Sequence, residues 1–350
     1  MEPAHTLTTR PQVVRADSTS SSLNGSDDDG ELWNRPPQRQ SREGRPGPRV
    51  ALRRLAEDSA WAKRPQDGDI YNSMELFFPE HDLDRPLVEE IQEGSVNPST
   101  STFKWVRGEL IGKGTVGRVY LALNASTAEC MAVKQVEIPD RHDNSPDHKR
   151  QSILVETLKA ESEILKDLDH SNIVNYMGYE ETPSHCNIFL EYVPGGSIGS
   201  IVRQYGKLSE DMTKFFTRQI LDGLVYISTK GLVHRNLHSN NVLVEMNGTC
   251  KISDFGLARQ VSDEKPCPFQ GATFWMAPEL ISPHEKSSYS KVDIWSLGCL
   301  VLEMLSGQRP WAGENSFSAM YQLKVLPPVA EGVTLSDLAE DFIREKCLAM

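Results

Sequence analysis

The residues best suited to chemistry begin with a glycine-rich run, Gly112-Lys113-Gly114-Thr115-Val116-Gly117. Glycines in a turn let backbone N–H groups approach the oxygens of a phosphate, because no Cβ atom stands in the way. The following residues, Arg118 to Leu121, have the character of a strand, so the run is predicted to join two strands as a hairpin. A Rossmann fingerprint would instead require a helix after the loop. Taken alone, the motif also fits an ordinary glycine-rich turn.

Two charged residues farther along are predicted to form a buried ion pair. Lys134 ends the run Met131-Ala132-Val133-Lys134 within a predicted strand, and Glu161 lies within a helical stripe of leucines that runs from Leu154 to Leu168. A carboxylate on an apolar helix face needs a cationic partner, because burying it unpaired is costly. Glu163, about 200° farther round the helix, should face water. The alternative interpretation makes Lys134 a surface lysine.

Three further motifs follow in a fixed order. They are the run His234 to Asn241 (HRNLHSNN), Asp254-Phe255-Gly256 and Ala277-Pro278-Glu279. With the glycine loop and Lys134, this set resembles the protein kinase domain over about residues 103–350.

Several phrases are similar to a narrower group, the fungal MAP kinase kinase kinases of the cell-wall-integrity type. Within the domain these phrases are Gly108–Gly112, Asn187–Ser197 and Phe274–Glu279. The upstream run Phe77–Asp84 also looks like the stretch that precedes the domain in that group.

The predicted fold class is α+β, a bilobal protein kinase-like fold. A small β-rich N-lobe is expected at about residues 103–190 and a large helical C-lobe at about 194–350, with the C-lobe incomplete at its C-terminus relative to the family. Strands are expected at Trp105–Ile111, Arg118–Leu123 and Cys130–Glu137. A buried helix face is expected from residues that recur at helical spacing, namely Met212, Phe216, Ile220, Leu224 and Ile227.

The resemblance implies ATP and Mg²⁺ as the bound groups. The residues expected to bind ATP are Ile111, Gly112, Gly114, Gly117, Val119, Ala132, Lys134, Glu161, Leu190, Glu191, Val193 and Leu243. Asn241 and Asp254 would hold Mg²⁺, which neutralises charge on the transferring group. A spine joining the lobes would be formed by Leu165, Tyr176, His234 and Phe255.

The catalytic loop departs from the family pattern at positions expected to carry the chemistry. Asn236 stands where the family has the catalytic Asp, and His238 stands where it has a Lys. An amide can accept a hydrogen bond but takes up no proton, and His at its ordinary pKa is mainly neutral at pH 7. Ala272 replaces the hydroxyl residue that bridges the two, and a shift that lets Thr273 restore the bridge is disfavoured. Val116 replaces the usual aromatic tip of the glycine loop.

These departures leave three hypotheses. The first is a pseudokinase that binds ATP and Mg²⁺ and is impaired in phosphotransfer, acting as a partner in a MAP kinase cascade. The second is a functioning Ser/Thr protein kinase of low activity that phosphorylates a MAP kinase kinase. The third is a degenerate gene product of marginal stability without a function.

Composition excludes other classes of protein. The chain has 350 residues and a net charge of −12, which argues against a basic nucleic-acid-binding face. No apolar run approaches the roughly 20 residues of a membrane span, and six cysteines without a C-x-x-C pair favour reduced thiols and a cytoplasmic protein. Residues 1–100 are expected to be largely disordered, with two short segments of docking-like character. A short helix is one interpretation of Val50–Trp61, and docking on a partner or on the main domain is one of Met74–Ile91, but a fluctuating tail is favoured for both.

Overall fold

The computed structural model describes only part of the chain. The described residues are 52, 53, 55, 57, 61, 103–114, 116–139, 146–261, 272–280, 291–315, 327, 329 and 333–349. The chain divides into two compact units, Met1–Arg45 and Pro46–Met350, and every described residue belongs to the second. The predictions for the rest of the first 100 residues, including the segment Met74–Ile91, lie outside the described residues.

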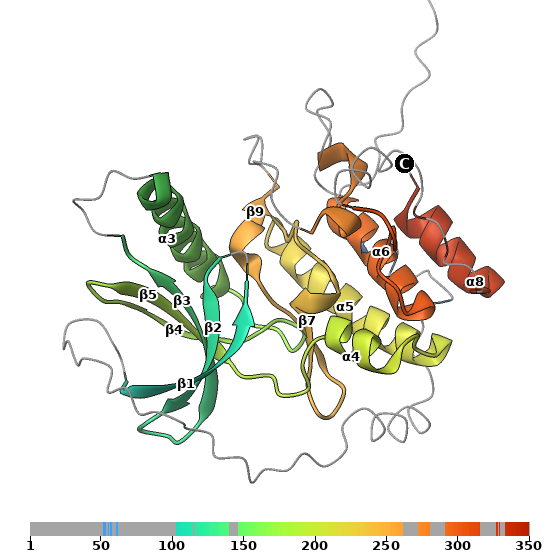
Figure 1. Cartoon of the computed structure of the whole chain (residues 1–350). Helices are drawn as coiled ribbons and strands as arrows, with labels where there is room; N and C mark the ends of the chain where they lie inside the picture. The colour runs from blue at the N-terminus through green and yellow to red at the C-terminus, as the bar shows by residue number, and fades with distance from the viewer. Residues whose placement is uncertain are drawn as a thin grey trace, which may run out of the picture. The chain divides into compact units, whose positions relative to one another are not determined.

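The N-terminal part of the domain is a five-stranded antiparallel sheet with one long helix (Figure 1). Its elements are β1 (Trp105–Lys113), β2 (Arg118–Asn124), β3 (Cys130–Glu137), α3 (Pro146–Leu165), β4 (Tyr176–Glu181) and β5 (His185–Glu191). The strand order is β1-β2-β3-β5-β4. The three predicted strands are confirmed, with β1 and β2 extending slightly farther than the apolar pattern indicated.

The sheet register places the predicted binding residues on one face. Val119 of β2 pairs with Lys134 of β3, and Ala132 of β3 pairs with Leu190 of β5. Side chains two residues apart on a strand point to the same side, and directly paired residues share that side. Val119, Lys134, Ala132 and Leu190 therefore line the same face of the sheet.

The C-terminal part is mainly helical. Its longer elements are α4 (Ile198–Tyr205), α5 (Glu210–Thr229), α6 (Val292–Ser306), α8 (Asp337–Glu340) and the π-helix η6 (Asp341–Cys347). Ser197 begins α4 in a capping box with Ser200, and Ser209 caps α5 by accepting from the Met212 backbone N–H. The predicted apolar face of α5 is confirmed, because every residue in it is buried.

Short elements between α5 and α6 carry the motif residues. They are β6 (Leu232–Val233), η1 (Ser239–Asn241), β7 (Val242–Val244), β8 (Cys250–Ile252), η2 (Phe255–Leu257), β9 (Arg259–Gln260), η3 (Thr273–Trp275) and η4 (Pro278–Leu280). The strands β7 and β8 pair with each other, as do β6 and β9. These two hairpin-like pairings hold the catalytic-loop run and the Asp254 motif next to each other.

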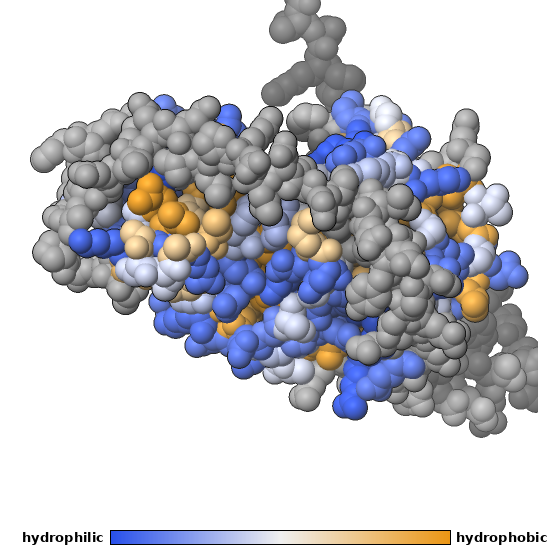
Figure 2. Space-filling model, turned by 90° about the horizontal axis from the view of Figure 1, so that it is seen from below, coloured by the Kyte–Doolittle hydropathy of each residue, from blue (hydrophilic) through white to orange (hydrophobic). Residues whose placement is uncertain are grey.

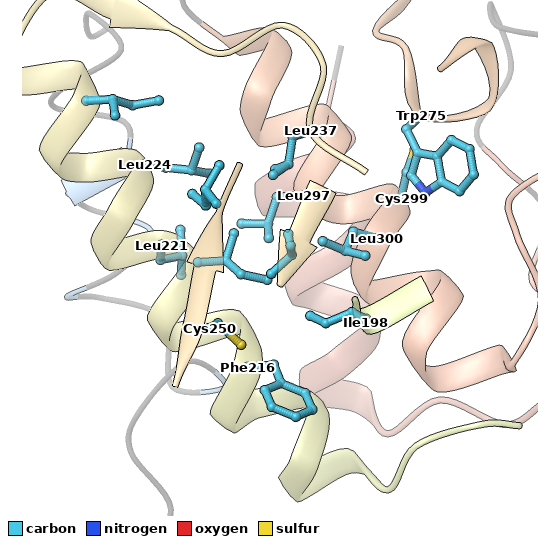
Figure 3. Packing of buried hydrophobic residues seen from close by; sticks show 14 of the residues in the cluster. Ile198, Phe216, Leu221, Leu224, Leu237, Cys250, Trp275, Leu297, Cys299 and Leu300 are labelled. Atoms are coloured by element: carbon cyan, nitrogen blue, oxygen red, sulfur yellow. The ribbon is translucent and has the colours of Figure 1, made fainter. Parts of the chain in front are cut away.

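One apolar core extends through the helical part. Phe216, Leu221 and Leu224 of α5 pack in it with Leu297 and Leu300 of α6 (Figure 3). The helix α6 is buried from Val292 to Leu305. The described cysteines are all free thiols.

The described surface shown in Figure 2 is largely hydrophilic, with small apolar areas separated by polar side chains. Among the described residues, no helix combines the length and the apolar character needed to cross a membrane.

The β1–β2 hairpin allows a test with two neighbouring glycines. Gly117 has φ +84°, and a Cβ there would lie 2.3 Å from the Gln135 carbonyl oxygen, whereas at Gly114 the nearest atom would be 3.8 Å away. We expect Gly117→Ala to lower the free energy of unfolding by about 1–3 kcal/mol because the new methyl group collides with backbone. Gly114→Ala should change it by less than about 0.5 kcal/mol. Urea denaturation of both variants measures this, and equal effects would contradict the described hairpin.

Candidate active site

A lysine held between two carboxylates forms the centre of the site. Lys134 Nζ lies 2.9 and 2.7 Å from the two carboxylate oxygens of Glu161, and 2.6 Å from Oδ1 of Asp254. Lys134 and Glu161 are only 4% and 1% exposed. The predicted Lys134–Glu161 pair is confirmed, and Asp254 is a second carboxylate partner that the sequence did not predict.

Mutual attraction keeps this cluster charged. Burial would lower the pKa of Lys134, but the nearby carboxylates of Asp254 and Glu161 raise it above its ordinary value. Burial would raise the pKa of Asp254, yet the ammonium group of Lys134 outweighs that effect and lowers it. For Glu161 burial is the larger effect and raises the pKa. Lys134 therefore presents a full positive charge.

The elements around the cluster hold its members in place. Glu161 extends from α3 and also accepts a hydrogen bond from the backbone N–H of Phe255. The ring of Phe255 meets that of His234 edge-to-face at 4.8 Å, and both residues are fully buried. Leu165 and Tyr176 pack in the same apolar cluster. The four residues of the predicted spine thus lie in one continuous core.

A buried aspartate of α6 anchors the catalytic loop. The carboxylate of Asp293 accepts hydrogen bonds of 2.8 Å from the backbone N–H groups of both His234 and Arg235. Arg235 adopts φ +66°, a left-handed conformation that a non-glycine residue rarely takes. The two hydrogen bonds stabilise this turn, which sets the direction of the next residue, Asn236.

Asn236 uses both ends of its amide. Its Nδ2 donates to Oδ2 of Asp254 at 3.0 Å, and its Oδ1 accepts from the backbone N–H of Ala272 at 3.3 Å. It is 4% exposed. An aspartate here would place a second carboxylate beside Asp254, and two carboxylates sharing a site repel each other unless a proton or a cation separates them. The amide removes that repulsion.

The segment before η3 contacts the catalytic loop through its backbone. Among the described residues, the hydroxyl of Thr273 makes no hydrogen bond to Asn236 or His238, and the Ala272 N–H supplies the link to Asn236. A shifted bridge through Thr273 is therefore not formed.

Asp254 and Asn241 fit the ligand set of Mg²⁺. The Nδ2 of Asn241 donates to the Asn236 carbonyl oxygen at 2.9 Å and approaches Oδ2 of Asp254 at 3.4 Å. No hydrogen bond of the described residues uses Oδ1 of Asn241, which leaves that oxygen for a cation. Mg²⁺ prefers hard oxygen ligands, usually one or two carboxylates completed by phosphate and water. One carboxylate and one amide oxygen meet that requirement.

His238 does not carry the positive charge that the family's lysine supplies. Its Nδ1 accepts a hydrogen bond of 3.3 Å from the backbone N–H of Asn240, and its ring centroid lies 5.4 Å from that of Trp275. Burial lowers the pKa of His238 to about 4, with the charge of Asp254 opposing this. The side chain is therefore neutral at pH 7, as the sequence predicted.

The remaining residues predicted to bind the nucleotide differ in their exposure to solvent. Ile111 is 40% exposed, and the side chains of Val119, Ala132 and Leu243 are partly exposed. Apolar side chains left partly uncovered offer a surface for a flat aromatic base. The residues Leu190 and Val193 are buried, and the carboxylate of Glu191 is held by the Asn175 N–H at 2.6 Å and by Lys251 at 2.8 Å.

The glycine loop packs against the site through Val116. The Gly114 N–H donates to the Gly117 carbonyl oxygen at 3.1 Å, which closes the hairpin. Val116 at the tip is only 4% exposed, and a Cβ on Gly256 would lie 3.4 Å from its side chain. Val116, at the position of the family's aromatic tip residue, thus packs against the Asp254-Phe255-Gly256 motif.

The sequence motifs missed one positioning residue. Glu303 of α6 accepts hydrogen bonds of 2.8 Å from the hydroxyl of Ser239 and from the indole N–H of Trp275. It therefore links the catalytic loop to η3. The signal was the acidic residue within the apolar run of residues 294–305, because a buried carboxylate must have donors.

Comparison with known proteins agrees with this geometry. Residues 105–349 match the protein kinase domain family. The chain belongs to that family.

Its relatives are named as kinases of fungal signalling cascades. The chain is 47% identical over 246 residues to the MAP kinase kinase kinase mkh1 of Schizosaccharomyces pombe, an alignment that covers 68% of this chain and 22% of that protein. It is 45% identical over 252 residues to the serine/threonine-protein kinase BCK1/SLK1/SSP31 of Saccharomyces cerevisiae, covering 69% and 17%. The predicted resemblance to fungal MAP kinase kinase kinases is confirmed, and the chain spans about a fifth of the length of these relatives.

The low pKa of His238 predicts a measurable pH dependence. As pH falls from about 6.5 to about 4, the unfolded chain binds a proton at His238 that the folded protein does not bind, so the fold loses stability progressively through that range and does not regain it below. His238→Gln keeps a polar side chain that does not titrate. We expect the variant to lose less unfolding free energy than the wild type between pH 7 and pH 5. Urea denaturation at both pH values measures this difference, in which all other titrating groups cancel, and identical losses would contradict it.

Proposed function

We propose that this chain is a MAP kinase kinase kinase-like protein that binds ATP with Mg²⁺ and is impaired in phosphoryl transfer, a pseudokinase. The observation that carries the proposal is the hydrogen bond from Asn236 Nδ2 to Asp254. The group at the position of the catalytic base is a donor toward the metal-binding carboxylate and takes up no proton.

The retained charges support nucleotide binding. Lys134 is fixed by Glu161 and Asp254, so its ammonium group is already oriented and desolvated when a phosphate arrives. A phosphate oxygen would share the lysine with Asp254, while Glu161 keeps the side chain in position. Asp254 and Asn241 would hold Mg²⁺, which supplies charge neutralisation between phosphate groups. The uncovered side chains of Ile111, Val119, Ala132 and Leu243 would pack on the adenine.

The residues of the catalytic loop support the loss of transfer. A substrate hydroxyl must give up its proton as its oxygen bonds to phosphorus, and Asn236 does not take it. His238 is a poor substitute, because its pKa of about 4 makes it a weak base and its Nδ1 accepts from Asn240. General-base catalysis is worth about 10²–10⁴-fold in rate, so its loss leaves little turnover.

The second hypothesis remains a functioning Ser/Thr protein kinase of low activity that phosphorylates a MAP kinase kinase. The specific observation in its favour is the formed Lys134–Glu161 ion pair, which active members of the family require. Under either hypothesis we propose a cytoplasmic protein that interacts with proteins of a MAP kinase cascade, in keeping with the names of its relatives.

Nucleotide binding is tested by replacing two lysines in separate variants. ATP and Mg²⁺ should raise the melting temperature of the wild type, since saturation at 100 times Kd stabilises a protein by about 2.7 kcal/mol. Lys134→Met should abolish the shift, whereas Lys166→Met, which changes an exposed lysine paired only with Glu163 across one helical turn, should retain it.

Because Lys134→Met also leaves two buried carboxylates without a cation, a second variant is needed. Ala132→Leu adds volume on the face expected to receive adenine and leaves the ion pair intact. Binding of a fluorescent ATP analogue at 10 °C should be lost in both variants. The absence of binding by the wild type at millimolar nucleotide would refute the binding claim.

Impaired transfer is tested by restoring the family residues together. We expect Asn236→Asp, His238→Lys and Ala272→Thr in one chain to raise the rate of phosphorylation of a MAP kinase kinase by roughly 10²-fold or more. Adding Lys134→Met to the triple variant is the control and should remove the gained activity. A wild-type rate close to that of the triple variant would favour the low-activity kinase and sink the pseudokinase proposal.

A further inference from the structure

A short segment ahead of the kinase domain is buried against the helical part. Leu52, Leu55 and Trp61 are 4%, 6% and 1% exposed, and they belong to the same apolar cluster as the core of α5 and α6. The family match begins only at residue 105, so these residues lie outside the recognised domain. They nevertheless belong to the same compact unit, Pro46–Met350.

The local sequence explains how this segment presents an apolar face. Leu52, Arg53, Leu55 and Glu57 are all helical. Leu52 and Leu55 are three residues apart, which places them on one side of the helix. Arg53 and Glu57 form an exposed ion pair of 2.7 Å, one turn apart. One face is thus apolar and buried, and the other is charged.

Trp61 makes the most specific contacts. Its indole N–H donates to Oε1 of Glu210 at 2.9 Å, and its ring centroid lies 4.8 Å from that of Phe342. The ammonium group of Lys214 lies 5.9 Å from the Trp61 ring centroid. A buried tryptophan needs a hydrogen-bond acceptor and an apolar wall, and this site supplies both.

Glu210 joins three parts of the chain. Besides the Trp61 N–H, its Oε1 accepts from the hydroxyl of Ser336 at 2.9 Å and from Lys214 at 2.8 Å. Ser336 is the N-cap of α8, and Glu210 is the first residue of α5. Burial alone would raise the pKa of Glu210, but the hydrogen bonds from Lys214, Ser336 and Trp61 lower it, so the acceptor stays ionised.

The segment η6, which carries Phe342, also packs closely against α6. Phe342 of η6 is fully buried, and a Cβ added to Gly298 of α6 would lie 2.6 Å from the Cβ of Cys347 in η6. Contacts of the terminal helical segment with α6 on one side and with Trp61 on the other therefore fix its position.

We propose that Leu52, Leu55 and Trp61 anchor an intramolecular docking segment, whose site on the large lobe is formed by Glu210, Lys214, Ser336 and Phe342. The segment holds α8 and η6 in place from outside the recognised domain. Two matched contacts identify this segment as the occupant of the site. The carboxylate of Glu210 accepts from the indole N–H of Trp61, and the ring of Phe342 packs against the Trp61 ring.

The test uses the full chain without nucleotide, so its outcome does not depend on the proposed function. Trp61→Ala should accelerate amide hydrogen exchange of residues 337–348 by roughly tenfold or more and lower the melting temperature by several degrees. Arg53→Ala, which changes an exposed residue of the same helix, should do neither. Trp61→Phe keeps an aromatic ring but loses the N–H donor, and should fall between the two.

Rescue in trans separates docking from a general loss of stability. A synthetic peptide of residues 46–65 should slow the exchange of the Trp61→Ala chain again, whereas the same peptide carrying Trp61→Ala should not. Exchange in the Trp61→Ala chain equal to that in Arg53→Ala would overturn the proposal. Light scattering that shows a wild-type dimer, lost in Trp61→Ala, would assign the contact to two copies and overturn the intramolecular assignment.

Discussion

The ion pair cluster around Lys134 constrains much of the fold. A buried lysine is tolerable only with anionic partners, and removing one partner of a buried pair typically costs about 3–5 kcal/mol. Here the partners come from opposite sides: Glu161 from α3 beside the sheet, and Asp254 from the loop after β8. Satisfying one ammonium group therefore requires the sheet, its helix and the loops of the helical part to meet at a single point.

The same requirement explains why Asn236 is compatible with this arrangement. Asp254 already gives one oxygen to Lys134, and its other oxygen accepts from Asn236. With an amide at this position both oxygens have donors in the protein itself. A carboxylate there would need a cation or a proton to offset the repulsion. The amide of Asn236 thus gives Asp254 a donor at a position where a carboxylate would repel it.

Local pattern was sufficient for much of the fold and for part of the site. Period-two alternation predicted the three strands, and the leucine stripe around Glu161 predicted its pairing with Lys134, because the residues that decide both lie close in sequence. The Trp61–Glu210 contact joins residues 149 positions apart, and no period or motif near Trp61 specifies that partner. The burial of Val116 was likewise beyond the sequence, since it depends on how the glycine loop lies against Gly256. The sequence shows that Trp61 and Val116 can be buried, and tertiary packing decides where.

Charge balance relates the substitutions in the catalytic loop to one another. The family pattern places an aspartate and a lysine two residues apart, a pair with no net charge. Replacing only the aspartate would leave a lysine in a partly buried loop without its nearby anion. Replacing only the lysine would leave an aspartate at position 236 beside Asp254 with one cation fewer. Asn236 and His238 together remove one charge of each sign, and the His238 pKa of about 4 keeps that balance at neutral pH. Ala272 removes the hydroxyl that would bridge the two groups, and its backbone N–H still donates a hydrogen bond to Asn236.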